Sequence, residues 1–185
     1  MSALDSQYWD RYAQDHATHY NEEMAKFIRD LALSLKTQSV LEIGCSAGND
    51  LKLFSDEFDI KGIDTSQIAI THAQKNLPRF SFQMGQADSI PFEDNSIDLV
   101  FTRNLFNHVD SVKKGVEEMF RVSKKYIFNI ELFSENEERQ SDNPTTFGRN
   151  MKQYWMDYKV KIISNVDMHE EIDSKKSRFT LLRKI

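Results

Sequence analysis

Cysteine and long apolar runs are scarce in this sequence. Cys45 is the sole cysteine among 185 residues, so an internal disulfide is excluded and no cysteine cluster can hold a metal ion. No run of about eighteen apolar residues occurs, and the opening residues are polar and aromatic. The pattern therefore predicts neither a transmembrane helix nor a signal peptide. Together these absences predict a protein of the reducing cytoplasm.

An excess of basic charge is also missing. The formal net charge is −5, which argues against general affinity for the phosphate backbone of nucleic acids. The sequence contains no internal repeat and no low-complexity segment. Its length predicts one domain over residues 1–185 with a sizeable core, and nothing in it indicates an oligomeric state.

What the sequence does contain is organised around residues 39–64. An apolar run at 40–43 is typical of a buried parallel strand, and the small residues of 44–48 follow it as a turn. A second strand is expected at 60–63 and ends on Asp64. An acid about twenty residues after a glycine turn is the spacing of a nucleotide-binding strand–helix–strand unit.

The residue types of this stretch suit that chemistry. Gly44 and Gly48 let the backbone turn tightly and approach a ligand where a Cβ would collide. The carboxylate of Asp64 can accept both hydroxyls of a ribose. A helix capped by Asn49 or Asp50 is expected between the two strands. Its apolar face would comprise Leu51, Leu53, Phe54 and Phe58.

Two motifs carry a family resemblance. Residues 42–48, EIGCSAG, resemble the E/D-x-G-x-G-x-G motif of class I S-adenosylmethionine-dependent methyltransferases, with Ser46 in place of the middle glycine. Residues 85–102, GQADSIPFEDNSIDLVFT, are similar to the G-D-A-x-x-L-P-F-x-D-x-S-F-D-x-V block of the same enzymes. The two blocks stand in the order and spacing of that family, which argues against a glycine turn that binds no nucleotide. A dehydrogenase is excluded because the glycine spacing ends too soon for G-x-G-x-x-G and nothing downstream resembles a nicotinamide site.

The resemblance implies S-adenosylmethionine as the cofactor and no metal. It implies that the side chain of Gln86 reads the adenine amino group beside the backbone of Ala87, with Asp88 as the alternative reader. It also implies that an N-terminal helical segment, expected over residues 5–35, folds over the methionine end through Tyr8 or Tyr12. The implied cofactor-binding residues are Gly44, Cys45, Ser46, Gly48, Asp64, Thr65, Gln86, Ala87, Asp88, Arg103 and Tyr12.

The rest of the chain completes an α/β pattern. A helix capped by Thr65 and Ser66 is followed by strands and one further helix. By resemblance we expect a three-layer Rossmann-like methyltransferase fold, with a mostly parallel seven-stranded sheet of order 3-2-1-4-5-7-6 and an antiparallel last strand. One class I domain would span 1–185, with a helical cap at 1–36 and a variable insertion at 133–158. The further elements are expected at 80–84, 96–102, 110–123, 126–132, 160–166 and 178–183.

The expected strands and crossover helices account for nearly all residues between 40 and 132. We therefore expect the acceptor site to be built from the two irregular ends of the chain. The insertion offers Arg149, Tyr154 and Trp155, and an arginine in a polar loop is rarely needed for packing. Trp155 is equally well explained as a core residue of a late helix. His108 follows the fourth expected strand, where it can start a helix, act as a general base or contact the acceptor. The Lys175–Lys176 pair is expected to be solvated surface.

The predicted function is methyl transfer from S-adenosylmethionine to a small or sugar-like acceptor. Because the donor is activated by its own charge, the protein mainly orients the reactants, which explains the lack of a catalytic triad. The layout of RVSKKYI at 121–127, an acidic loop, FGR at 147–149 and WMDY at 155–158 resembles that of methylases of pseudaminic-acid and other surface-sugar biosynthesis. The alternatives are a binding or regulatory protein without turnover and a methyltransferase of a macromolecular acceptor.

Overall fold

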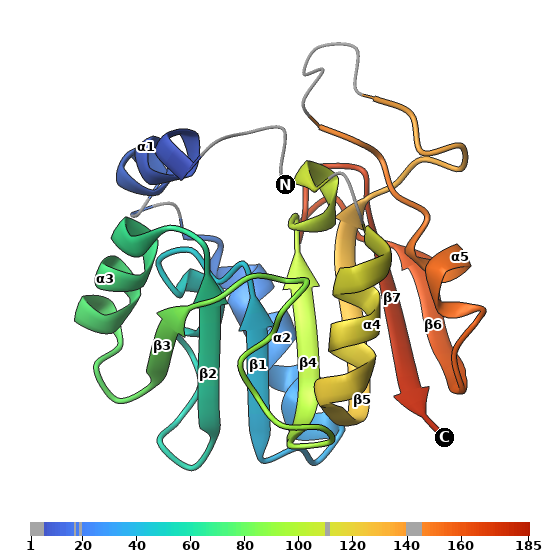
Figure 1. Cartoon of the computed structure of the whole chain (residues 1–185), viewed down its shortest axis with the longest axis horizontal. Coiled ribbons are helices and arrows are strands. Elements are labelled where there is room, and N and C mark those ends of the chain that lie inside the picture. The colour runs from blue at the N-terminus through green and yellow to red at the C-terminus, as the bar shows by residue number, and fades with distance from the viewer. Residues whose placement is uncertain (1–5, 17, 19, 110–111, 140–145) are drawn as a thin grey trace.

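One mixed sheet runs through the computed structural model, which describes residues 6–16, 18, 20–109, 112–139 and 146–185. Seven strands pair in the order β3-β2-β1-β4-β5-β7-β6 (Figure 1). This is the predicted order, and the predicted strands are confirmed. Their bounds are Ser39–Ile43 (β1), Asp59–Asp64 (β2), Ser81–Met84 (β3), Ile97–Arg103 (β4), Ser123–Leu132 (β5), Val160–Asp167 (β6) and Ser177–Lys184 (β7).

The direction of the strands decides where their loops meet. β1 to β5 pair in parallel, and β7 is antiparallel to both of its neighbours, β5 and β6. β6 therefore runs in the same direction as β5. As a result, the turn between β6 and β7 lies at the same edge of the sheet as the loops that follow β1, β2, β3 and β4.

Helices cover both faces of the sheet, as the three-layer prediction requires. Alternate residues of each strand point to opposite faces. On one face Val40, Leu99 and Phe128 pack with α2 and α3, and on the other Leu41 and Val100 pack with α4 and α5. The helices are Ser6–His16 (α1), Glu22–Ser34 (α2), Gln67–Asn76 (α3), Val112–Val122 (α4) and Met151–Trp155 (α5), and two short 3-10 helices span Asn49–Leu51 (η1) and Phe106–His108 (η2).

The expected N-terminal cap of residues 1–36 needs correction. The segment forms two helices, because Asn21 interrupts it and accepts a hydrogen bond from the backbone of Met24 as the N-cap of α2. α2 buries Met24, Ile28 and Ala32 against the sheet. Only α1 lies over the edge of the sheet where the loops gather (Figure 1).

The prediction of an α-helix after the glycine turn is wrong. Only the single turn η1 forms there, and the backbone bonds that follow it, such as Phe54 N–H to Leu51 O at 3.3 Å, span three residues instead of four. Asp50 does not cap a helix, because its carboxylate pairs with Arg103. Leu51 and Phe54 are nevertheless buried, so the apolar pattern identified core residues in a segment that is not an α-helix.

Within the described part of the chain, no helix is long and apolar enough to cross a membrane.

Candidate functional site

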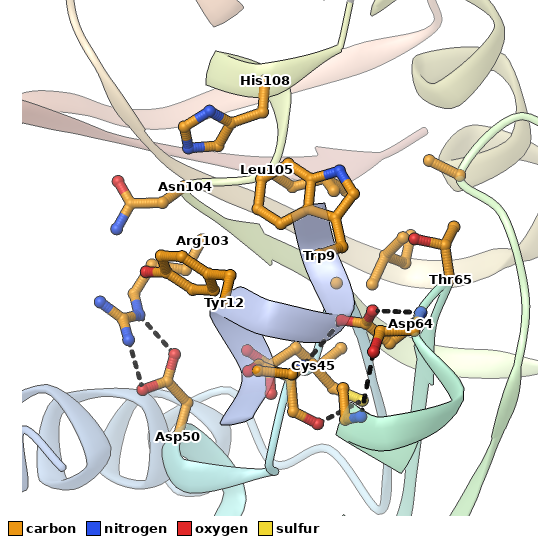
Figure 2. A pocket seen from close by; sticks show the side chains of 18 of the residues that line it. Trp9, Tyr12, Cys45, Asp50, Asp64, Thr65, Arg103, Asn104, Leu105 and His108 are labelled. Atoms are coloured by element: carbon orange, nitrogen blue, oxygen red, sulfur yellow. Dashed lines mark hydrogen bonds and ion pairs between the residues drawn. The ribbon is translucent and has the colours of Figure 1, made fainter. Parts of the chain in front are cut away.

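A cavity of about 550 Å³ lies at the carboxyl edge of the sheet, beneath α1 (Figure 2). Its walls come from the loops after β1, β2, β3 and β4, from the segments around α1, and from the turn between β6 and β7. Parallel strands place their carboxyl ends at one edge, so segments far apart in sequence meet there. The predicted cofactor residues that line it are Gly44, Cys45, Ser46, Asp64, Thr65, Gln86, Ala87, Asp88, Arg103 and Tyr12, and His108 lines it too.

Gly48 is the one predicted cofactor residue that lies away from the cavity lining. Its backbone is left-handed, with φ of 76°, and a Cβ on it would approach Leu77 at 3.2 Å and Phe82 at 3.3 Å. Gly48 therefore serves the turn and its packing against Leu77 and Phe82. A Cβ on Gly44, whose φ is 77°, would meet Leu105 at 3.0 Å, on the neighbouring loop.

Asp64 is fixed at the end of β2 by two backbone donors. Its Oδ2 accepts the N–H of Ser46 at 2.9 Å, and its Oδ1 accepts the N–H of Ser66 at 2.9 Å. Burial raises the pKa of this carboxyl, while the backbone hydrogen bonds oppose the shift. A carboxylate has about four lone-pair sites, so both oxygens can still accept from a ligand in the cavity.

A buried acidic pair with one arginine forms another part of the wall. Arg103 donates to both carboxylate oxygens of Asp50 (Figure 2), with Nη2 to Oδ1 at 3.0 Å. Glu42 lies beside this pair, and burial and the charge of Asp50 raise its pKa well above the usual range. Glu42 Oε2 is buried with no hydrogen-bond partner among the described residues. The wall therefore offers an acceptor to a cationic group.

The helix α1 covers the cavity through a few specific contacts. The hydroxyl of Ser66, which caps α3, donates to Asp10 Oδ1 at 2.6 Å. The ring of Trp9 meets the imidazole of His108 edge to face at 5.2 Å between centroids. Tyr12 also lines the cavity, and burial raises the pKa of its phenol. Of the two candidates for closing the site, Tyr12 is part of the cavity lining, whereas Tyr8 stacks against Tyr12 and lies outside the lining.

His108 sits in a half-buried position on the loop after β4. Burial and the nearby charge of Lys175 lower the pKa of its imidazole to about 4. The side chain is therefore neutral at pH 7.

The loop that carries His108 is held from below by a buried hydrogen-bonded chain. Trp155 Nε1 donates to Asn129 at 2.8 Å, Asn129 Nδ2 donates to Thr102 at 2.8 Å, and the hydroxyl of Thr102 donates to Glu131 Oε1 at 2.7 Å. Glu131 also accepts the backbone N–H of Leu105 at 3.3 Å. Burial raises the pKa of Glu131 to about 7.

The insertion holds the same loop from the side, which corrects its predicted role. The guanidinium of Arg149 is buried and donates to the carbonyls of Phe106, at 2.9 Å, and Val109. Trp155 is fully buried, and the hydroxyl of Tyr154 donates to Glu137 at 2.7 Å. Arg149, Tyr154 and Trp155 all lie outside the cavity lining, because their polar groups satisfy protein partners. Residues 140–145 of the insertion lie outside the described residues.

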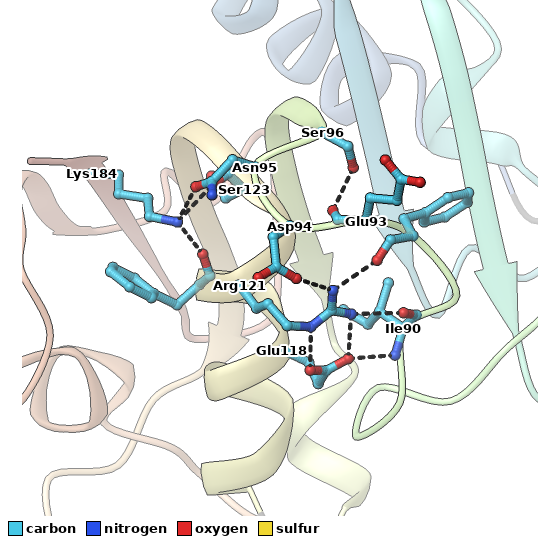
Figure 3. Close-up of polar contacts among 11 residues, drawn as sticks. Ile90, Glu93, Asp94, Asn95, Ser96, Glu118, Arg121, Ser123 and Lys184 are labelled. Carbon is cyan, nitrogen blue, oxygen red and sulfur yellow. Dashed lines mark hydrogen bonds and ion pairs between the residues drawn. The ribbon is translucent and has the colours of Figure 1, made fainter.

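The loop after β3 is clamped by two residues of α4 (Figure 3). Arg121 donates to the carbonyls of Ile90 at 2.9 Å and Phe92 at 2.8 Å, and to Asp94 at 2.8 Å. Glu118 accepts from Arg121 and from the backbone N–H of Ile90 at 2.8 Å. This clamp fixes the segment that directly follows the cavity residues Gln86–Asp88.

Sequence reasoning missed several cavity residues. It gave no role to Tyr20 and Asn21, which line the cavity from the segment between α1 and α2. Lys175 was assigned to solvated surface, yet it lines the cavity. The position of Lys175 could have been inferred from the predicted topology. β6 runs parallel to β5, so the turn that follows β6 lies at the carboxyl edge of the sheet. Among the described residues, no cluster of three or more His, Cys, Asp or Glu side chains could hold a metal ion.

A sheet of this order with its cavity at the carboxyl edge defines the Rossmann-like class I methyltransferase fold. Magnesium protoporphyrin IX methyltransferase from Synechocystis, solved with bound S-adenosylmethionine, superposes with a TM-score of 0.76 over 100% of both chains at 10% identity. At that identity the likeness concerns the fold alone.

Sequence comparison then identifies the family. A model of a methyltransferase domain matches residues 41–126. An uncharacterised methyltransferase from Bacillus subtilis is 35% identical over 108 residues, covering 52% of this chain and 43% of that protein. Norajmaline N-methyltransferase from Rauvolfia serpentina is 33% identical over 98 residues, covering 49% of this chain and 34% of that protein. The chain therefore carries a methyltransferase domain of the class I S-adenosylmethionine-dependent family over residues 41–126, and it spans less than half the length of these curated relatives.

Proposed function

We propose that this protein transfers a methyl group from S-adenosylmethionine to a small acceptor, in a cytoplasmic setting. The proposal rests on the position and orientation of the Asp64 carboxylate. Its two oxygens are preset by the N–H groups of Ser46 and Ser66 at the end of β2, facing the cavity, where a ribose needs a double acceptor. Ten of the eleven cofactor residues implied by the sequence motifs line the same cavity.

The residues of the wall fit the donor chemically. Its adenine would lie at Gln86–Asp88, its ribose at Asp64, and its amino group at the buried Glu42 Oε2 that has no described partner. Bound S-adenosylmethionine would supply a methyl group already activated on a sulfonium. The carboxylates of the wall favour a cationic ligand.

The protein's own contribution is orientation and exclusion of water. α1 roofs the cavity through Trp9 and Tyr12, and such positioning is the main demand of an in-line displacement. The imidazole of His108 is neutral at pH 7 because burial and Lys175 hold its pKa at about 4. His108 can therefore accept a proton from the methyl acceptor, but a pKa of about 4 makes it a weak general base.

The first test is donor binding by calorimetry in the wild type and in Asp64→Ala. Losing a charged double acceptor should cost about 1.5–3 kcal/mol of binding free energy. Undiminished affinity in the variant would refute the assignment. Asp56→Ala is the matched control, because Asp56 lies outside the cavity lining and pairs with Arg79.

The second test separates an enzyme from a binding protein. The purified protein is incubated with methyl-labelled donor and a cell extract, and label transfer is followed separately in the small-molecule and macromolecular fractions. A protein that binds the donor yet transfers no label to any fraction would be a binding or regulatory protein. Label recovered only on macromolecules would favour a macromolecular acceptor.

A further inference from the structure

The wall of the cavity is divided by charge. The lining carboxylates are Glu42, Asp50, Asp64 and Asp88, and all belong to β1, β2 or the loops that follow β1 and β3. The opposite part is built by the loop after β4 and the turn between β6 and β7. Its described lining residues contain no carboxylate; they are Asn104, Leu105, His108, Val109 and Lys175.

The two cations of the lining are in different situations. Arg103 is neutralised by Asp50, to which it donates twice. Lys175 forms no ion pair with any carboxylate in the part of the chain that the structure describes. The nearest acid in sequence, Asp173, is buried and accepts the backbone N–H of Lys175 at 3.0 Å, so it shapes the turn. The ammonium of Lys175 therefore lines the cavity without a described counter-ion.

Lys175 lies on the part of the wall opposite the lining carboxylates, where a methyl acceptor would bind next to the donor. His108 and Lys175 both line the cavity, on the loop after β4 and on the turn between β6 and β7. Figure 2 shows His108 and Asn104 on one side of the Trp9 and Tyr12 rings, and Asp50 with Asp64 on the other. A ligand bound between His108 and Lys175 would have the aromatic rings of α1 beside it.

We propose that Lys175 is an anion-binding residue that selects a methyl acceptor bearing a carboxylate. The inference rests on the proposed function, because it takes the donor to occupy the acidic part of the wall. A cationic sulfonium on one side and an ammonium on the other favour an anionic molecule between them. The carboxylate of the donor's own amino-acid part could also pair with Lys175. The calorimetry described below distinguishes a carboxylate of the donor from one of the acceptor.

The experiment uses the full chain saturated with S-adenosylhomocysteine and a pair of matched probes, benzoate and benzamide. The two are alike in size and differ in charge. Dissociation constants come from saturation-transfer NMR titrations. The wild type should bind benzoate about two- to fivefold more tightly than benzamide, the strength of a partly exposed ion pair. Lys175→Gln should remove this preference, and Lys175→Arg should keep it.

Lys176→Gln is the matched control, because it removes an adjacent exposed charge that lies outside the lining and should leave the preference intact. Equal binding of the two probes by the wild type, or a preference that survives in Lys175→Gln, would overturn the proposal.

Calorimetry with S-adenosylhomocysteine and with 5′-methylthioadenosine, which lacks the amino-acid part, identifies the source of the carboxylate. Lys175→Gln should bind both as the wild type does. A selective loss of S-adenosylhomocysteine affinity would assign Lys175 to the donor and overturn its role toward the acceptor. If the wild type binds neither nucleoside, the proposed function itself is refuted, and this inference with it.

Discussion

Removal of Arg121 should weaken donor binding although Arg121 touches no part of the cavity. The change Arg121→Ala deletes the donors to the carbonyls of Ile90 and Phe92 and leaves Glu118 with the backbone N–H of Ile90 alone (Figure 3). The loop that carries Gln86–Asp88 would then be held mainly by its own backbone contacts.

The stability that Arg121→Ala should lose depends on how exposed the clamp of Arg121 and Glu118 is. Hydrogen bonds from a charged donor contribute about 1.5–3 kcal/mol each when buried. The Arg121 side chain is 30% exposed and Asp94 is 69% exposed, so water replaces part of this. We expect a loss of about 2–3 kcal/mol in the free energy of unfolding, or about 5–10 °C in Tm. Reordering the backbone of about one residue on binding would weaken donor affinity about tenfold.

The assay is calorimetry with S-adenosylhomocysteine and 5′-methylthioadenosine, beside thermal unfolding. Both ligands should lose affinity equally, because the effect concerns the adenosine end. Arg79→Ala is the matched control: Arg79 also donates to two loop carbonyls, those of Lys52 and Phe54, and pairs with Asp56, away from the cavity. It should lower Tm while donor affinity stays unchanged. Equal donor affinities for the Arg121 and Arg79 variants would refute the reasoning.

Three other variants test the site and its support. Gln86→Leu should weaken donor binding while Asp88→Asn does little, and the opposite ranking in a titration would assign adenine reading to Asp88. Arg149→Ala should lower the free energy of unfolding by about 3 kcal/mol, since its buried guanidinium binds two loop carbonyls, and an unchanged Tm would restore Arg149 as an acceptor-binding candidate. Glu131 has its pKa raised to about 7, above its unfolded value, so its contribution to stability is present at low pH and is lost as pH rises through 7. In urea unfolding from pH 5 to 8, the free energy of unfolding of Glu131→Gln should rise relative to that of the wild type by up to about 1.4 kcal/mol per pH unit. Parallel stability curves would contradict this.

The fold could be predicted because its signals are local or belong to long motifs. Apolar runs, the glycine turn and the acid at Asp64 each lie within a few residues of the structure that they specify. The helix expected after Gly48 failed for a non-local reason. Asp50, a plausible helix cap in sequence, is bound by Arg103, which lies 53 residues further along the chain. A contact at that separation leaves no mark on the periodicity of either segment.

The role of Arg149 was missed because polarity in sequence does not report burial. The segment around it is acidic and irregular, which is typical of a surface loop. Its guanidinium instead satisfies backbone carbonyls that the 3-10 turn η2 leaves unpaired. An irregular loop has many such carbonyls, and a buried arginine with five donors is well suited to bind several of them.

The two irregular ends of the chain therefore serve different purposes. The N-terminal helix supplies cavity side chains, Trp9 and Tyr12, whereas the insertion supplies support for the loop that carries His108. The family match over residues 41–126 contains every lining carboxylate, but it excludes Trp9, Tyr12 and Lys175. The shared sequence thus encodes the acidic part of the wall and also Asn104, Leu105, His108 and Val109, whereas Trp9, Tyr12 and Lys175 come from segments outside it. The family match therefore does not cover Lys175, the residue that we propose selects the acceptor, and the Lys175→Gln variant tests that role.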